Sequence, residues 1–189
     1  MCVLHAATRP GGTRVKTNIC LVGFMGTGKT RAGRIVAELM GKQFVETDAM
    51  IEAAASKPIT RIFNEDGEIR FRELEIAVIK QAASMENAVF SLGGGAVLNT
   101  INMLYMQRSS VVICLVARPA VLLQRLVHEE REKRPLLAKP DPAREIERLL
   151  AIRAPFYAAA TDLVIDTSML SIEDVASKII AFFNSWKDK

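Results

Sequence analysis

Residues 23–30 read Gly23-Phe24-Met25-Gly26-Thr27-Gly28-Lys29-Thr30. This stretch is a complete phosphate-binding loop of the form G-x-x-x-x-G-K-[ST]. Glycines let the backbone curl so that successive N–H groups point at phosphate oxygens, which a Cβ atom would obstruct. Lys29 can reach the β- and γ-phosphates, and the Thr30 hydroxyl can ligate the Mg²⁺ that accompanies them. The motif therefore indicates binding of a nucleoside triphosphate.

The sequence on either side of the loop supports this interpretation. Residues 19–22 form an apolar run typical of a buried strand, and residues 31–40 follow with helical periodicity. The loop is thus expected at a helix N-terminus, where the helix dipole and free N–H groups favour an anion. A mere glycine-rich turn between strand and helix is the alternative, and these flanks argue against it.

Composition fits a single domain with a hydrophobic core. It has 189 residues, 50% of them hydrophobic, and a net charge of +4, which fits one domain with a proper core. The 25 Lys and Arg residues include no long basic run, so nucleic acid is not favoured, whereas anionic small molecules suit the same surplus. The longest apolar stretch, residues 111–117, is far too short to span a membrane.

The N-terminus and the cysteines bear on location in the cell. Residues 1–16 lack the apolar core of a secretory signal, and we expect a disordered leader ahead of a single domain at 17–189. The three cysteines give no disulfide framework. Cys20 and Cys114 fall in apolar runs, where cysteine behaves as a small hydrophobe, so both are expected in the core. We expect a reducing compartment, the cytoplasm.

Strand-like and helix-like segments alternate along the chain. Strands are predicted at residues 19–22, 43–46, 88–92, 111–116 and 163–165. Helices are predicted between them, notably at residues 68–83, 119–127, 144–153 and 172–186. This alternation of short apolar strands and helices predicts an α/β fold with a parallel sheet covered on both faces.

Local signals mark two helix starts and one irregular stretch. Asp141-Pro142 offers an N-cap residue with proline at the first helical position. Ser171-Ile172-Glu173-Asp174 resembles a capping box with Asp in place of Glu. Residues 128–140 hold seven charged residues and two prolines, which is typical of a solvated loop and equally of a lid in a phosphoryl-transfer enzyme.

Two carboxylates follow the second predicted strand, in Glu46-Thr47-Asp48. Strand alternation would put Glu46 and Asp48 on the same side of the chain, at the carboxyl end of a strand where open α/β sheets bind ligands. One carboxylate could act on Mg²⁺ while the other orients an acceptor hydroxyl. The alternative is that both simply cap the next helix.

A glycine triplet, Gly93-Gly94-Gly95, follows the third predicted strand. Glycines at the end of a strand serve tight turning or close backbone approach to a ligand. A plain flexible turn would rarely need all three residues. We therefore favour substrate contact.

Three arginines are candidates for binding a carboxylate or a phosphoryl group, as bidentate guanidinium groups do. Arg72 has Glu75 three residues later, where it could hold the guanidinium in place. Arg134 lies in Arg-Pro-Leu-Leu, and Arg153 opens Arg-Ala-Pro-Phe-Tyr near the end of a predicted helix. Each arginine alone is most often a surface charge, and spacing cannot assemble these groups into one site.

Taken together, the motifs closely resemble the shikimate kinase family over nearly the whole chain, from about residue 17 to residue 186. The phosphate-binding loop is shared by many enzymes, but the ordered set is specific to this family. The matching pieces are Gly-Phe-Met-Gly-Thr-Gly-Lys-Thr, Glu-Thr-Asp followed by Ile51-Glu52, Ile62-Phe63, Gly67-Glu68, Phe71-Arg72, Ser91-Leu92-Gly93-Gly94-Gly95, Arg134-Pro135-Leu136-Leu137 and Arg153-x-Pro-x-Tyr.

The resemblance implies transfer of the γ-phosphoryl group of ATP to the 3-hydroxyl of shikimate, toward chorismate and the aromatic amino acids. By position, Asp48 matches the aspartate that binds the shikimate hydroxyls and assists proton removal. Arg72 and Arg153 match the arginines that hold the substrate carboxylate. Gly94, between Gly93 and Gly95, matches a backbone contact to shikimate. Phe63 and Phe71 match residues that form apolar walls of the shikimate pocket.

On the nucleotide side, the resemblance implies that Lys29 acts on the transferred group and that Gly26, Thr27 and Gly28 hold the phosphates. Thr30 and Glu46 match the Mg²⁺ position. Arg134 matches a lid arginine that swings onto the phosphates, and Arg125 is similar in place to an arginine that packs on adenine. The resemblance also implies a three-layer α/β/α fold like that of nucleoside-monophosphate kinases, sheet order 2-3-1-4-5, a substrate-binding segment at about 48–83, a lid at about 128–140, and a monomer.

The chain departs from the family at one position, where Glu46 replaces the first aspartate of the usual Asp-x-Asp. Glutamate keeps the charge but adds a methylene. A water between the carboxylate and Mg²⁺ could absorb that shift. We hypothesise that activity survives.

Two other functions stay open from the residues alone. Another small-molecule kinase on this scaffold, of the gluconate or nucleoside-monophosphate type, would use the same loop, and paired arginines fit any monocarboxylate. A nucleotide-dependent binding protein that has lost catalysis is the second alternative, for which Glu46 is the hint.

Overall fold

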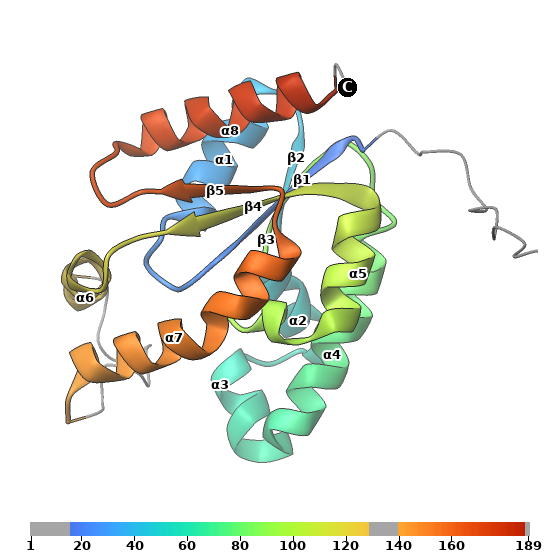
Figure 1. The fold of residues 1–189 in the computed structure, drawn as a ribbon. Helices are drawn as coiled ribbons and strands as arrows, with labels where there is room; N and C mark the ends of the chain where they lie inside the picture. Colours follow the sequence, from blue (N-terminus) through green and yellow to red (C-terminus); the bar gives the residue numbers. More distant parts are fainter. Residues whose placement is uncertain (1–15, 129–139, 188–189) are drawn as a thin grey trace, which may run out of the picture.

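One parallel sheet forms the centre of the molecule (Figure 1), in a computed structural model that describes residues 16–128 and 140–187. The strand order is β2-β3-β1-β4-β5, and all neighbouring strands run parallel. The strands are β1 Asn18–Gly23, β2 Gln43–Glu46, β3 Ala88–Ser91, β4 Ser110–Val116 and β5 Leu163–Asp166. Each lies within one residue of its prediction, and the order confirms the expected fold.

Helices connect successive strands, as parallel strands require. They are α1 Lys29–Leu39, α2 Thr47–Ala55, α3 Ile59–Arg61, α4 Gly67–Ala82, α5 Thr100–Ser109, α6 Pro119–His128, α7 Pro142–Ala160 and α8 Ile172–Lys187. A π-helical turn at Ile62–Asp66 precedes α4, and a 3₁₀ turn at Ala96–Leu98 precedes α5.

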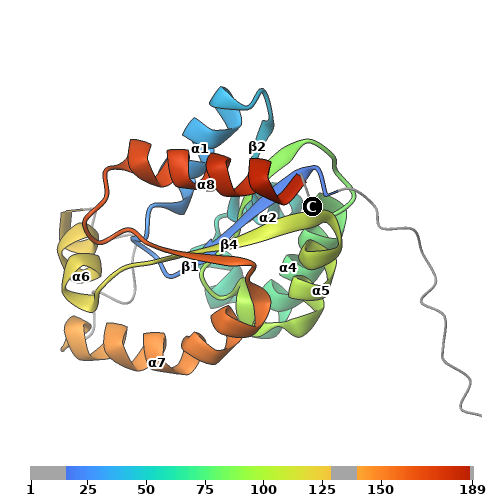
Figure 2. The ribbon, with the colours of Figure 1, turned by 45° about the horizontal axis from the view of Figure 1, so that its top comes forward.

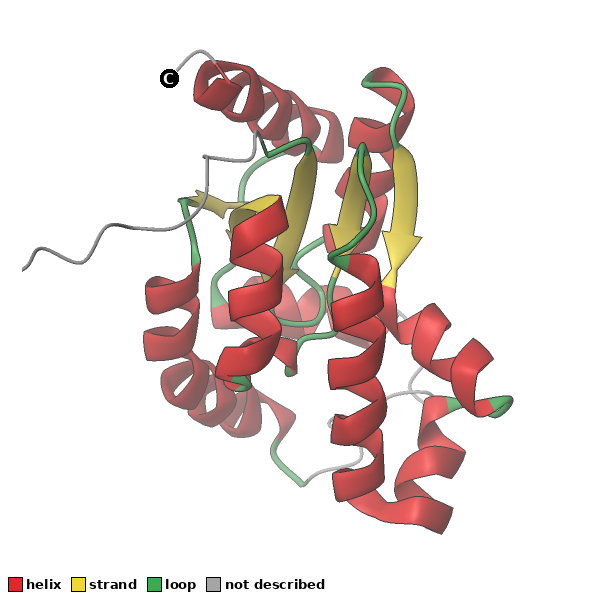
Figure 3. Cartoon of the chain, turned by 90° about the vertical axis from the view of Figure 1, so that its right-hand side faces the viewer, coloured by secondary structure: helices red, strands yellow, loops and turns green. Residues whose placement is uncertain are grey.

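Alternating side chains of β1 build a core on each face of the sheet. Ile19 and Leu21 pack with buried residues of α1 and α8, whereas Cys20 and Val22 pack with residues of α4, α5 and α7. Figures 1 and 2 show α1 and α8 together on one side of the strands and α4 and α5 on the other. The side view in Figure 3 shows the strands between these helical layers. Cys20 and Cys114 are buried free thiols, as predicted.

The two predicted helix starts are confirmed. The Asp141 side chain accepts a hydrogen bond from the backbone N–H of Arg144 at 3.0 Å. The Ser171 hydroxyl accepts from the N–H of Asp174 at 3.0 Å and donates to its carboxylate at 2.7 Å. Side-chain oxygens thus satisfy amide groups that a helix leaves unpaired at its start.

The prediction that the helix beginning near residue 144 ends at residue 153 is wrong. Helix α7 continues to Ala160 with Pro155 inside it. Proline removes one backbone donor, but Tyr157 and Ala160 are buried against the sheet beyond it. Burial of these side chains offsets the lost hydrogen bond, so tertiary packing overrides the local signal.

The topology gathers the predicted motifs at one edge of the sheet. The phosphate-binding loop follows β1, the glycine triplet follows β3, and these two strands are hydrogen-bonded neighbours. Glu46 ends β2, which is the next strand outward. Carboxyl ends of parallel strands lie at the same edge, where ligands bind in open α/β sheets. Within the described part of the chain, no helix is long and apolar enough to cross a bilayer.

Candidate active site

The loop after β1 is held open by its own side chains. Gly28 is the N-cap of α1 with φ 95°, a left-handed conformation that glycine adopts without strain. The Thr27 hydroxyl donates to the carbonyl of Phe24 at 2.8 Å. Nζ of Lys29 donates to the carbonyls of Gly23 and Phe24 at 2.9 and 3.0 Å. The ammonium group is thus tethered over the loop, where phosphates would meet it.

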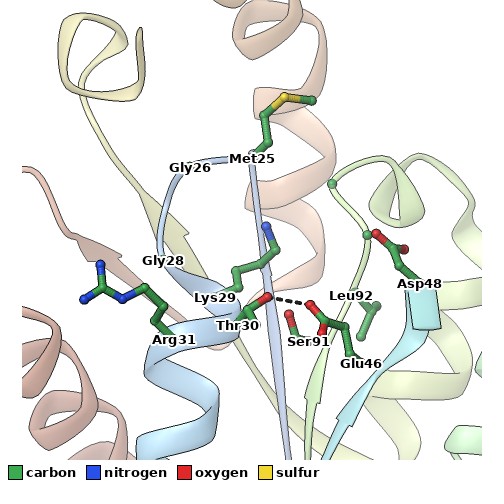
Figure 4. A pocket seen from close by; sticks show the side chains of 12 residues that line it. Met25, Gly26, Gly28, Lys29, Thr30, Arg31, Glu46, Asp48, Ser91 and Leu92 are labelled. Carbon is green, nitrogen blue, oxygen red and sulfur yellow. Dashed lines mark hydrogen bonds between the residues drawn. The ribbon is translucent and has the colours of Figure 1, made fainter. Parts of the chain in front are cut away.

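A cavity of about 400 Å³ opens in front of this loop (Figure 4). Its walls bring together the loop, the end of β2 and the segment after β3. The lining residues include Gly26, Gly28, Lys29, Thr30, Glu46, Asp48, Gly93 and Gly94. The phosphate-binding loop, the two carboxylates and two glycines of the triplet therefore border one cavity.

Glu46 is connected to the loop by Thr30. The Thr30 hydroxyl donates to Oε1 of Glu46 at 2.6 Å (Figure 4). Nη2 of Arg34 lies 3.7 Å from Oε2. A hydroxyl and a carboxylate are hard oxygen ligands of the kind that Mg²⁺ takes alongside substrate phosphates and waters. The pair fits that ion, although no group of three or more acidic, His or Cys ligands lies among the described residues.

The expected strand alternation from Glu46 to Asp48 is wrong, because the chain turns helical between them. β2 ends at Glu46, and α2 begins at Thr47. Asp48 therefore lies in the first turn of α2 and reaches the same cavity from a helix. Glu46 is the N-cap residue of α2, but its side chain makes no capping hydrogen bond. Capping thus does not explain this carboxylate.

Asp48 is a mostly buried carboxyl group beside the glycine triplet. A Cβ atom at Gly93 would come within 2.5 Å of Oδ1 of Asp48, so the absence of a side chain there makes room for the carboxylate. Burial raises the pKa of Asp48 above its usual range, while the ammonium of Lys29 opposes the shift. Thr47, which sequence reasoning missed, links the two strand ends: its hydroxyl accepts from the N–H of Gly93 at 3.3 Å and lies 3.3 Å from the carbonyl of Ser91.

Arg72 lies on α4 and approaches the triplet from the other side. A Cβ atom at Gly95 would be 3.2 Å from both terminal nitrogens of Arg72. Nη1 donates to both carboxylate oxygens of Glu75, at 3.2 and 3.1 Å, as the three-residue spacing predicted. Burial raises the pKa of Glu75, and the Arg72 guanidinium opposes that shift. The arginine is therefore held in a fixed direction.

Arg153 reaches the triplet from α7. The prediction that it lies near a helix end is wrong, because α7 extends seven residues past it to Ala160. Nη1 of Arg153 and the hydroxyl of Tyr157 both donate to the carbonyl of Gly94, at 3.1 and 3.0 Å. Burial raises the pKa of Tyr157 to about 12, so the hydroxyl stays a donor. Sequence reasoning gave Tyr157 no role, although the i, i+4 spacing with Arg153 was available.

Phe63 and Phe71 stack on each other with ring centroids 4.5 Å apart. Phe71 is buried with Ile51 and Ile62, and the Arg72 guanidinium lies 5.1 Å from its ring centroid. Phe63 is exposed. Neither ring is among the residues lining the cavity at the loop, so their predicted part as walls of the acceptor pocket stays a prediction.

A second cavity, of about 830 Å³, also borders the loop and is lined by several arginines. Arg125 donates to the carbonyl of Gly26 at 3.2 Å and to the hydroxyl and carbonyl oxygens of Thr167 at 3.0 and 2.7 Å. Arg118, not predicted, lines the same cavity, with Nη2 3.0 Å from the sulfur of Met169. The predicted lid residue Arg134 lies outside the described residues.

The comparisons with known proteins agree with this geometry. The family model described as “Shikimate kinase” matches residues 25–184. The chain belongs to the shikimate kinase family. The shikimate kinase of Symbiobacterium thermophilum is 44% identical over 163 residues, covering 86% of this chain and 94% of the relative.

Solved structures place the family in its wider fold. The shikimate kinase from Acinetobacter baumannii in complex with shikimate superposes with a TM-score of 0.85 at 35% identity, covering 92% of this chain and 96% of that one. A gluconokinase from Sinorhizobium meliloti 1021 gives a TM-score of 0.60 at 19% identity, covering 93% and 96%, which shows a shared fold alone.

Proposed function

We propose that the protein transfers the γ-phosphoryl group of ATP to the 3-hydroxyl of shikimate, as a shikimate kinase. The observation that carries this proposal is the glycine triplet, which has Asp48, Arg72 and Arg153 against its three backbone units and faces the phosphate-binding loop. One carboxylate and two guanidinium groups suit a hydroxylated monocarboxylic acid. Membership of the family names the same substrate.

Positioning and electrostatics supply most of the catalysis in phosphoryl transfer, since a loose transition state needs little covalent help. The loop backbone and Lys29 hold the phosphates, and the Lys29 ammonium moves from the loop carbonyls onto the transferring group. Arg72 and Arg153 hold the substrate carboxylate, which aims the ring at the loop. The resemblance to the family gives Arg134 the role of adding positive charge next to the phosphates.

Asp48 orients the acceptor hydroxyl and accepts its proton. The raised pKa of this carboxyl suits it to hold a proton that leaves the hydroxyl during transfer. The ammonium of Lys29 opposes the shift in Asp48 and so favours the ionised carboxylate that accepts the proton. Acceptor and donor are thus brought together between Asp48 and the loop.

The Thr30 hydroxyl and, directly or through a water, Glu46 would hold Mg²⁺. The 2.6 Å separation of the two oxygens supports this assignment. When bound, the ion neutralises charge on the phosphate oxygens. Nη2 of Arg34 pairs with the other oxygen of the Glu46 carboxylate at 3.7 Å.

The remaining expectations are part of the same proposal. A substrate-binding segment at about 48–83 corresponds to α2 through α4. The proposed lid at about 128–140 lies almost entirely outside the described residues. We further propose that the enzyme is a cytoplasmic monomer that needs no nucleic acid or membrane.

A coupled assay of ADP release tests the function. We expect shikimate to stimulate release at least about 100-fold over gluconate and over nucleoside monophosphates, a ratio within reach of a site that pairs several polar groups with its substrate. Preference for gluconate would assign the gluconate-type alternative. ATP binding without shikimate-stimulated ADP release would assign the binding protein that has lost catalysis.

A further inference from the structure

Two carboxylates of one helix share the guanidinium of Arg72, and they differ sharply in exposure. Glu75, three residues later on α4, has a side chain only 2% exposed and holds Nη1. Glu68, four residues earlier, has a side chain 66% exposed. Oε1 of Glu68 accepts from Nε at 3.3 Å and from Nη2 at 3.1 Å. One carboxylate therefore belongs to the core and the other to the solvent-facing surface.

Glu75 is fixed in place by a further contact. Nδ2 of Asn102 donates to Oε2 of Glu75 and to the carbonyl of Ala96, both at 3.2 Å. Separating Glu75 from Arg72 would leave a buried carboxylate without a paired cation, which is unfavourable. Glu75 thus stays with Arg72 whatever else binds. Glu68 has no such restraint, because an exposed side chain is rehydrated when it leaves its partner.

The geometry of the guanidinium shows which edge a ligand can use. Its terminal nitrogens lie against Gly95, and Nη1 also holds Glu75. The edge formed by Nε and Nη2 makes no bond to Glu75. It offers the two parallel N–H groups that bind a carboxylate in bidentate fashion. Glu68 occupies that edge.

We propose that Glu68 holds the place of the substrate carboxylate on Arg72 and leaves when an acidic substrate arrives. This inference rests on the proposed function, in which Arg72 binds the carboxylate of the acceptor. Exchange of one carboxylate for another conserves the ion pair, whereas an uncharged polyol has no group with which to replace Glu68. Glu68 therefore lowers the affinity for the acid, whereas a neutral analogue leaves Glu68 on the arginine and does not compete with it.

The test is the affinity for shikimate, measured by titration calorimetry without nucleotide, in Glu68→Gln and Glu68→Ala. Both variants should bind shikimate about two- to fivefold more tightly than the wild type, which is the range of an exposed ion pair. Glu73→Gln is the matched control, because it removes the same charge from the same helix. Glu73 is exposed and pairs with Arg70 instead, so its variant should bind as the wild type does.

A second ligand separates carboxylate exchange from a general change in the site. The methyl ester of shikimate, followed by competition against shikimate, should bind the wild type and Glu68→Gln equally. Equal tightening for ester and acid would overturn the proposal. Weaker binding of shikimate by both Glu68 variants would also overturn it, because Glu68 would then be positioning Arg72 rather than competing for it. Unchanged binding would overturn it too, because Glu68 would then not compete with the substrate. Failure of the wild type to bind shikimate would instead reject the proposed function, so that titration comes first.

Discussion

The Glu46 side chain, one methylene longer than the aspartate usual in the family, reaches the Thr30 hydroxyl directly. The contact is short, 2.6 Å, and Arg34 lies on the far oxygen at 3.7 Å. The longer side chain therefore lines the cavity with one carboxylate oxygen on Thr30 and the other beside Arg34. An aspartate at this position would leave a gap that a water could fill.

We expect Glu46→Asp to stay active with a Mg²⁺ requirement within about threefold of the wild type, because a bridging water can replace the missing methylene. Glu46→Ala, which removes the carboxylate, should raise the requirement by about tenfold or more, as losses near a metal do. Titration of ADP release with Mg²⁺ measures both. A greatly lowered requirement in Glu46→Asp would show that the natural glutamate carries a penalty.

Individual contacts were predictable where the spacing was local. Glu75 was expected to hold Arg72 because residues three apart share a helix face, and it does so. The contacts from Thr47 to Gly93 and from Tyr157 to Gly94 join residues 46 and 63 positions apart. No local pattern carries such pairs, since they depend on which strands become neighbours.

Among the elements, strands and helix starts followed from the sequence, but two boundaries did not. Apolar runs bounded by polar residues gave all five strands of the described sheet. The predicted end of α7 was wrong because burial extends this helix, and the strand alternation expected from Glu46 to Asp48 was wrong because α2 begins at Thr47. Tyr157 and Ala160 draw α7 past Pro155, and α2 starts one residue after the last pairing of β2.

The contact between α7 and the glycine triplet predicts the effect of Tyr157→Phe. The change removes one of two donors to the Gly94 carbonyl and leaves Arg153 with the other. We expect the KM for shikimate to rise about three- to tenfold, the size of one hydrogen bond of about 1 kcal/mol, with the KM for ATP unchanged. Steady-state kinetics with each substrate varied will decide. Equal changes in both KM values would mean that the variant disturbs the whole sheet edge instead.

At the scale of the whole molecule, the site costs stability. Two cores cover the sheet and stabilise the fold, while the edge above them buries carboxyl groups whose charged forms are desolvated. Asp48 and Glu75 both have pKa values raised chiefly by burial. Such groups favour the unfolded chain once they ionise, which is a common trade between stability and activity.

Asp48→Asn should therefore raise the unfolding temperature at pH 7 by about 2–4 °C, typical of a change near 1 kcal/mol in a domain of this size, while abolishing activity. When the pKa of a carboxyl is raised in the folded state, the folded protein loses stability as the pH rises from the unfolded-state pKa to the folded-state pKa. The difference from wild type should thus shrink toward zero below pH of about 4.

Asp166→Asn should change the unfolding temperature at neutral pH in the opposite direction and lower it. Hydrogen bonds from Ser168 lower the pKa of Asp166, so its ionised form favours the folded state at neutral pH. Melting curves recorded between acid and neutral pH compare the two variants. A lower unfolding temperature for Asp48→Asn at pH 7 would contradict the assignment of burial as the dominant cause.

The close approach of Gly93 to Asp48 and of Gly95 to Arg72 has a consequence for how this enzyme can diverge over evolutionary time. A side chain added at either glycine would displace its partner, and a bulkier residue at either partner position would clash with the glycine backbone. Neither member of a pair can therefore be substituted alone. Change in acceptor preference would have to begin at neighbours such as Glu68, which alter what the arginine meets without touching the triplet. Substitutions should therefore accumulate at residues that surround the triplet, Asp48 and Arg72, while these residues themselves stay unchanged.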